Sequence, residues 1–171
     1  SSDAINSALK AFSVAAPKPV TVRVPAETYY IGKSIDMTNV SNYGTALRGY
    51  GRATSVIKAL STFSGAVTAS SDYASGTKAM VLVGTTSVAV SSFGIDISNI
   101  QFNGFAYVAA RLSIIYQPFF TQEFFNIEDC SLSGYSGYGI GIGAADERVA
   151  NNRPDINNCQ VSNCEIHDAR L

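Results

Sequence analysis

Three segments of the chain repeat one pattern of apolar and polar positions. They read ISNIQFNG at 97–104, IEDCSLSG at 127–134 and VSNCEIHD at 161–168. Apolar residues alternate up to an Asn or Asp, which indicates a strand with one buried face. The next apolar residue then follows after three positions instead of two, and this step would reverse the buried face unless the backbone bends there. Each segment therefore predicts a strand, a corner and a second strand.

The corners are predicted at Asn99, Asp129 and Asn163, because Asn and Asp adopt left-handed backbone angles more readily than most residues. The segments recur about every 30–35 residues, a spacing typical of repeat architectures. We therefore predict a parallel β-solenoid in which each coil lies about 4.8 Å from the previous one. Equivalent side chains then stack in columns, and the corner side chains can hydrogen-bond along their column.

An amphipathic helix is predicted before the coils, at residues 3–15, with Asp3 as its N-cap. The residues of its apolar face are Ile5, Ala8, Leu9 and Phe12. A single helix in front of a solenoid is suited to covering the apolar end of the first coil. The helix is therefore expected to act as a cap.

Residues 20–171 are predicted to form the coils, within one domain that comprises the chain 1–171. Segments with strand character lie at 20–25, 28–37, 46–59, 80–83, 88–90, 107–116 and 137–143. Two polar or small-residue segments, 61–78 and 143–155, are interpreted as excursions from the coils. Neither a strand nor a cap follows the last repeat of the pattern, so we expect the natural polypeptide to continue with more coils after Leu171.

The composition is that of a globular protein, with 46% hydrophobic and 15% charged residues. A net charge of −1 gives no electrostatic reason to expect a nucleic acid or an anionic membrane as partner. No apolar run in the sequence is long enough to insert across a bilayer. The chain has three cysteines, without the spacing of a disulfide framework. Cys130 and Cys164 are expected to be small buried residues of one inward column, the alternative being a reactive or metal-binding pair.

The opening of the chain resembles a known family. The helix beginning near Asp3, then TVRVPAETYYIG and ALRGYGRATSVIKA, are similar to the start of the pectate-lyase-like right-handed β-helix superfamily. Members of that superfamily typically show a D-A-I-x-x-A-L helix, then V-x-V-P-A-G-T-Y and L-x-G-x-G-x-x-T-x-I. Glu27 stands where the glycine of the second motif is usual. The resemblance implies an all-β fold, a right-handed parallel β-helix with a short N-terminal capping α-helix.

The same resemblance implies a class of ligand. The superfamily includes pectate lyases, polygalacturonases, alginate epimerases and phage tailspike depolymerases, which share the recognition of long polysaccharides on the outer face of the helix. We expect a tailspike-like protein that binds and depolymerises a bacterial surface polysaccharide, as a homotrimer on the virion tail next to other tail proteins. One alternative is a secreted, extracellular lyase or hydrolase acting as a monomer. Another is a non-catalytic structural or adhesive β-helix.

No cofactor motif and no metal-ligand spacing stands out in the sequence, so the residues themselves predict neither. A lyase of the pectate-lyase type would use Ca²⁺ bound by several acidic residues, with an arginine as base, and this pattern has no residue-by-residue match in the chain.

The first candidates for catalysis are Asp96 and Glu128. In the predicted register they are outward-facing diagonal neighbours on adjacent coils, at a separation of about 7–8 Å. This distance overlaps the roughly 6.5–9.5 Å between the two carboxyl groups of inverting glycosidases. The alternative is that both are ordinary solvated carboxylates on the face of a sheet.

The candidates for substrate binding are more scattered. Glu165 and His167 alternate on one strand and could form an acid–base pair, the alternative being ordinary surface residues. Tyr135 and Tyr138 are candidates for stacking on sugar rings, or for packing on a neighbouring coil. A charged group on the second excursion could contribute binding side chains or only keep a loop solvated; its members are Asp146, Glu147, Arg148 and Arg153. A phenylalanine-rich segment is expected to supply core residues, namely Phe119, Phe120, Phe124 and Phe125.

Overall fold

The computed structural model describes residues 2–10, 20–38, 44–65, 78–84, 92–107, 112–116, 122–141 and 156–170. Within these residues one short helix, α1 (Ser2–Lys10), is followed only by β-strands. Every strand pairing among them is parallel. The predicted all-β class with parallel sheets is confirmed at this level.

The strands follow one another as short segments separated by corners and loops. In chain order they are β1 Val20–Val24, β2 Thr28–Ile31, β3 Ile35–Thr38, β4 Thr45–Gly49, β5 Val56–Ala59, β6 Lys78–Gly84, β7 Ser92–Ser98, β8 Gln101–Asn103, β9 Leu112–Tyr116, β10 Gln122–Glu128, β11 Ser131–Ser133, β12 Ile140–Gly141, β13 Ile156–Asn157, β14 Gln160–Ser162 and β15 Glu165–His167.

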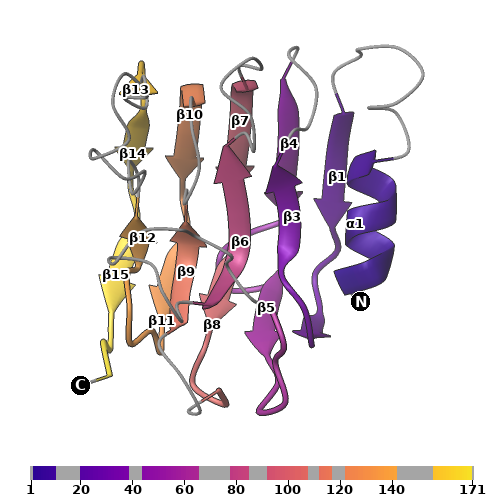
Figure 1. The fold of residues 1–171 in the computed structure, drawn as a ribbon, viewed down its shortest axis with the longest axis vertical. Helices are drawn as coiled ribbons and strands as arrows, with labels where there is room; N and C mark the ends of the chain where they lie inside the picture. Colours follow the sequence, from indigo (N-terminus) through magenta and orange to yellow (C-terminus); the bar gives the residue numbers. More distant parts are fainter. Residues whose placement is uncertain are drawn as a thin grey trace, which may run out of the picture.

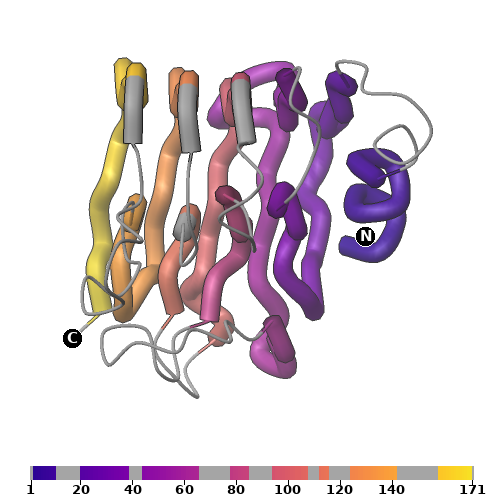
Figure 2. Tube along the Cα trace, turned by 45° about the horizontal axis from the view of Figure 1, so that its top comes forward, coloured from indigo at the N-terminus to yellow at the C-terminus, as the bar shows by residue number. Residues whose placement is uncertain are grey.

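The described strands form three parallel sheets. Sheet A has the order β1-β4-β7-β10-β13, with β14 also paired to β10; sheet B has β2-β5-β8-β11-β15, and sheet C has β3-β6-β9-β12. The chain visits A, B and C in turn and then starts again, so each such round lies beside the previous round. Figure 1 shows the strands of sheet A side by side in the order β1, β4, β7, β10 and β13, and Figure 2 shows the successive rounds stacked from indigo to yellow.

The predicted register of the repeated pattern is confirmed. Ile127 pairs with Ile97 on one side and with Val161 on the other. The corner residues that follow have left-handed backbone angles, with φ of 59° at Asn99, 52° at Asp129 and 49° at Asn163. The three occupy one column at the corner between sheets A and B, since Glu128 pairs with both Ser98 and Ser162 immediately before it.

A second column of left-handed residues was not predicted. It crosses sheet A before the first column and consists of Gly44 (φ 91°), Gly94 (φ 69°), Phe124 (φ 52°) and Asn158 (φ 54°). Because the backbone bends there, Phe124 points outward and is 55% exposed, so its predicted place in the core is wrong. Phe125 is fully buried as predicted, and Phe119 and Phe120 lie outside the described residues.

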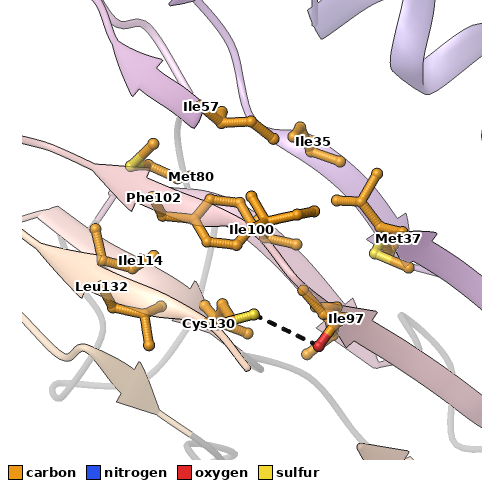
Figure 3. Close-up of a cluster of buried hydrophobic side chains, with 14 of the residues drawn as sticks. Ile35, Met37, Ile57, Met80, Ile97, Ile100, Phe102, Ile114, Cys130 and Leu132 are labelled. Atoms are coloured by element: carbon orange, nitrogen blue, oxygen red, sulfur yellow. Dashed lines mark hydrogen bonds between the residues drawn. The ribbon is translucent and has the colours of Figure 1, made fainter. Parts of the chain in front are cut away.

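The core lies between the three sheets and is built of stacked equivalent residues. Ile57, Phe102 and Leu132 pair in consecutive rounds of sheet B and are each 0% exposed. Figure 3 shows these side chains converging with Ile35, Met37 and Met80 from sheet C. The next residue of the same column, Ile166, is 45% exposed because β15 pairs with β11 only.

Helix α1 packs against β1 and β3 of the first round, as Figure 1 shows. Leu9 is buried, Ile5 is half-buried, and Ala8 is exposed, so the predicted apolar face is narrower than expected. Asp3 lies in the first turn and is not the N-cap, because the helix already begins at Ser2. Residues 11–15 of the predicted helix lie outside the described residues.

One side chain joins the helix to the edge of sheet C. The amide nitrogen of Asn6 donates to the carbonyl of Ser34 at 3.0 Å, and its oxygen accepts from the backbone N–H of Asp36 at 2.8 Å. Asn6 thus replaces a neighbouring strand for these two backbone groups, which otherwise lack a partner strand on that side. In the part of the chain that the structure describes, no helix has the length and apolar character needed to cross a membrane.

Candidate functional site

Polar side chains form columns over the outer faces of sheets A and B. Sheet A has two such columns, one of Asp96, Asn126 and Gln160 and the other of Ser98, Glu128 and Ser162. On sheet B they are Gln101, Ser131, Glu165 and Asn103, Ser133, His167. This register is the one predicted from the repeated pattern, because side chains alternate between the two faces of each strand. Three of these outward-pointing residues are nevertheless buried, namely Ser98, Ser131 and Ser133. The candidate site is this pair of neighbouring polar faces.

Asp96 is held by two neighbours on sheet A. Its Oδ2 accepts a hydrogen bond from Arg48 Nε at 2.6 Å, and its Oδ1 accepts one from Asn126 Nδ2 at 3.1 Å. Its side chain is only 18% exposed, whereas Arg48 is 48% exposed. The network spans three consecutive rounds, β4, β7 and β10, so the carboxylate is fixed in place between them.

Glu128 differs from Asp96 in its surroundings. It pairs with Ser98 and therefore lies diagonally from Asp96, as predicted. Its side chain is exposed, whereas the Asp96 carboxylate is engaged on both oxygens. A fixed, ion-paired carboxylate beside an exposed one provides two acidic groups in different environments, which is the condition for giving them different chemical roles.

His167 takes part in a hydrogen-bonded chain on sheet B. Its Nδ1 lies 2.7 Å from Asp168 Oδ2, and its Nε2 lies 3.2 Å from Ser131 Oγ. Asp168 has a left-handed φ of 55°, which turns its carboxylate back towards the ring. The contacts orient the imidazole, but Ser131 is only 6% exposed and is therefore poorly placed to act as a nucleophile.

Sequence reasoning selected His167 but neither of its two partners. The column register placed Ser131 near His167, yet a serine in a sheet carries no distinctive signal of its own. Asp168 follows the last predicted strand residue, and only its positive φ brings it to the histidine.

Glu165 has a separate partner from the loop after β4. Arg52 Nη2 lies 3.1 Å from Glu165 Oε1, and Arg52 Nη1 donates to the carbonyl of Asn163 at 3.3 Å. Arg52 is 111 residues from Asn163 in the sequence, so sequence spacing could not have revealed it. The predicted Glu165–His167 pair therefore lies on one strand, with each side chain engaged by different neighbours.

The aromatic candidates Tyr135 and Tyr138 were given two alternatives, stacking on sugar rings or packing on a neighbouring coil. Tyr135 is partly buried and packs against the hydrophobic core, and Tyr138 is also partly buried. These positions correspond more closely to the packing alternative than to a stacking platform. Other large aromatic side chains are exposed in the described residues, namely Tyr30, Tyr50, Phe105 and Phe124.

The charged group of the second excursion is not part of the described structure. Its members Asp146, Glu147, Arg148 and Arg153 lie within residues 142–155, outside the described residues. Their assignment to substrate binding stays a prediction.

All three cysteines are free; Cys130 is buried, and Cys159 and Cys164 are partly buried. Burial raises the pKa of the Cys130 thiol to about 12, and its sulfur donates to the carbonyl of Ile97 at 3.6 Å (Figure 3). Cys164 makes the equivalent contact to Ile127 at 3.7 Å one round later. The burial predicted for the two cysteines is confirmed for Cys130, whereas Cys164 is only partly buried. A thiol with a pKa as high as that of Cys130 is a poor nucleophile or metal ligand.

Among the described residues, no three His, Cys, Asp or Glu side chains gather closely enough to hold a metal ion. These residues therefore do not fit the calcium site that a lyase of the pectate-lyase type would use.

The chain was compared with known proteins at three levels. It matches no family model, no curated protein and no solved structure.

Proposed function

We propose that the protein is a right-handed parallel β-helix of the pectate-lyase-like type, which binds and cleaves a long bacterial surface polysaccharide in the manner of a phage tailspike. It acts as a homotrimer on the virion tail. The observation that carries this proposal is the set of in-register polar columns over sheets A and B. A polysaccharide presents similar groups at regular intervals, and a surface that repeats its side chains round by round is complementary to it.

The chemistry of the columns supports a sugar ligand. Guanidinium, amide and carboxylate groups such as those of Arg48, Asn126 and Asp96 can bind neighbouring hydroxyl groups in pairs. Exposed aromatic rings at Tyr30 and Tyr50 add the flat apolar surfaces on which sugar rings stack. The low net charge of the chain also agrees with a ligand recognised by hydrogen bonds and stacking more than by bulk electrostatics.

Cleavage uses the Asp96–Glu128 pair in this proposal. Asp96, fixed by Arg48 and Asn126, takes a proton from a water molecule whose oxygen attacks the anomeric carbon. Glu128, exposed on the neighbouring strand, is the general acid in this proposal and relays a proton from solvent to the leaving glycosidic oxygen as the C–O bond breaks. A diagonal separation of about 7–8 Å leaves room for the water and corresponds to hydrolysis with inversion. The mechanism contains no calcium step.

The test uses polygalacturonate, alginate and a panel of purified capsular and O-antigen polysaccharides. Binding is measured on immobilised polysaccharide, and cleavage by the appearance of reducing ends. We expect binding and slow hydrolysis of at least one bacterial polysaccharide, and loss of hydrolysis in the Asp96→Asn, Glu128→Gln double variant. The control is Asp3→Asn, which removes an exposed carboxylate from helix α1, away from the polar columns. Full hydrolysis by the double variant would exclude this pair from catalysis.

The mass in solution separates the tailspike from its alternatives. A trimer that binds a bacterial surface polysaccharide agrees with the proposal. A monomer that forms unsaturated uronates from pectate or alginate, detected by their ultraviolet absorbance, would identify a secreted lyase instead. Absence of binding to every polysaccharide tested would favour a structural or adhesive role.

A further inference from the structure

Phe124 combines two unfavourable features at one position. Its backbone is left-handed, with φ of 52°, and its side chain is 55% exposed. A bulky residue with positive φ is a conformational outlier, because its Cβ approaches the following carbonyl. An exposed phenyl ring adds apolar surface in contact with water. Phe124 is not part of the hydrophobic core of the described residues, so these residues show no gain in stability from a phenylalanine here.

The other rounds show what the bend itself requires. The equivalent positions hold Gly44, Gly94 and Asn158, with φ of 91°, 69° and 54°. Glycine and asparagine are the residues that adopt this conformation at least cost. The geometry of the fold is thus satisfied without an aromatic ring, and Phe124 is the exception in its column. A strained residue of this kind is a reason to look for function.

The surroundings of the ring are those of a sugar subsite. Phe124 lies two positions before Asn126 on β10, about 7 Å along the strand. Asn126 donates a hydrogen bond to Asp96, and Asp96 also accepts a hydrogen bond from Arg48. The result is an exposed aromatic ring beside an ordered amide–carboxylate–guanidinium network on one face of sheet A.

Glycines keep the space beside the ring free of side chains. The neighbouring positions in the two preceding rounds are Gly94 and Gly44. A Cβ added to Gly94 would lie 3.0 Å from the Cα of Gly44, so a larger residue is disfavoured there by space as well as by φ. The left-handed column beside the Asp96 network therefore has an aromatic ring at Phe124 and no side chain in the two preceding rounds that would block access to it.

We propose that Phe124 is the stacking platform for one pyranose ring of the bound polysaccharide. The C–H face of the sugar lies on the phenyl ring, and its hydroxyl groups hydrogen-bond to Asn126 and Arg48. This inference rests on the proposed polysaccharide binding and adds the residue that positions the sugar ring next to the Asp96–Glu128 pair. It also explains why a costly aromatic residue occupies a position where glycine or asparagine suffices.

The test compares stability and binding in the same variants. Phe124→Asn introduces the residue used in the next round, relieves the backbone strain and removes the ring. We expect its melting temperature to rise by about 2–4 °C because the strain is relieved. Its affinity for the polysaccharide that the unaltered chain binds should fall about tenfold, because the sugar no longer covers about half of a phenylalanine side chain. Phe124→Tyr keeps both ring and strain, and should keep the affinity. Phe105→Asn removes another exposed phenylalanine, at 44% exposure, and should leave the affinity unchanged.

Opposite effects on stability and affinity identify a binding role. If Phe124→Asn binds as tightly as the unaltered chain, the platform is wrong although polysaccharide binding stands. If this variant melts at a lower temperature, Phe124 supports the fold and the inference fails. If the unaltered chain binds no polysaccharide of the panel, the proposed function and the platform fail together. If Phe105→Asn loses as much affinity as Phe124→Asn, exposed rings have a general effect, and the assignment to Phe124 is overturned.

Discussion

The side-chain amide of Asn163 donates a hydrogen bond to the carboxylate of Asp129 one round earlier. The two residues are 34 positions apart in the sequence and share the same left-handed backbone conformation. The contact joins consecutive rounds at the corner between sheets A and B, in addition to the backbone hydrogen bond from the Asp129 N–H to the Ser162 carbonyl. Asn and Asp therefore serve two purposes here, because they allow the bend and link it to the next bend.

Replacing Asp129 by a β-branched residue should show how much this corner contributes to the free energy of unfolding. Asp129→Val loses the hydrogen bond and forces a branched side chain into positive φ, which should lower the free energy of unfolding by about 2–4 kcal/mol. Asp129→Asn keeps the bend and a hydrogen-bonding group, and should stay within about 0.5 kcal/mol. Urea unfolding followed by circular dichroism gives both values. Equal stability of the two variants would contradict the role of the corner.

The contact of Asn6 with β3 predicts how firmly the helix is attached. Asn6→Ala leaves the Ser34 carbonyl and the Asp36 N–H without their side-chain partner, and should lower the free energy of unfolding by about 1–2 kcal/mol. The control is Ser7→Ala on the exposed side of the same helix, which should change it by no more than about 0.5 kcal/mol. Faster hydrogen exchange in β3 of the Asn6 variant is expected as well. Unchanged exchange would argue against Asn6 as a substitute for a strand.

The buried thiol of Cys130 predicts a loss of stability at high pH. Burial raises the pKa of this thiol from 9.0 to about 12, so the unfolded chain releases its proton at a lower pH than the native chain does. The contribution of the protonated thiol to the free energy of unfolding is fully present below about pH 9. It falls by about 1.4 kcal/mol per pH unit as the pH rises towards about 12.

Cys130→Ala removes this titration. The difference in unfolding free energy between the unaltered chain and the variant should therefore narrow above about pH 9 and be constant below it. Urea unfolding under reducing conditions at about pH 8, 9 and 10 measures this difference. A difference that does not change over this range would show that the thiol is accessible to water in the native protein.

The network around Asp96 predicts a structural effect that is separate from catalysis. Asp96→Ala leaves Arg48 and Asn126 without their shared acceptor. The partial exposure of Arg48 weakens the ion pair, so the expected loss is about 1–2 kcal/mol, most of it from the hydrogen bonds. Glu128→Ala should cost no more than about 0.5 kcal/mol because Glu128 is exposed. Thermal unfolding of both variants checks this, and equal losses would contradict it.

The repeated pattern by itself determined the register of sheets A and B in the three rounds that carry it, and the first corner column. Ile97, Ile127 and Val161 pair as predicted, and Asn99 and Asp129 bend as predicted. These features are local, because alternation decides which face of a strand is buried and Asn or Asp decides where the backbone can turn. The outward positions of Asp96 and Glu128 follow from the same alternation.

Only the tertiary structure decided which partners the outward side chains have and where the second bend lies. Arg48 reaches Asp96 across 48 residues, and Arg52 reaches Glu165 from a loop whose path the sequence does not specify. Phe124 appears apolar and inward in the sequence, yet the glycine bends of earlier rounds impose the same left-handed backbone on its round and turn it outward. Stacked parallel strands must follow the path of their neighbours to keep their hydrogen bonds, so one round's conformation is set by the rounds beside it, whatever its own residues prefer.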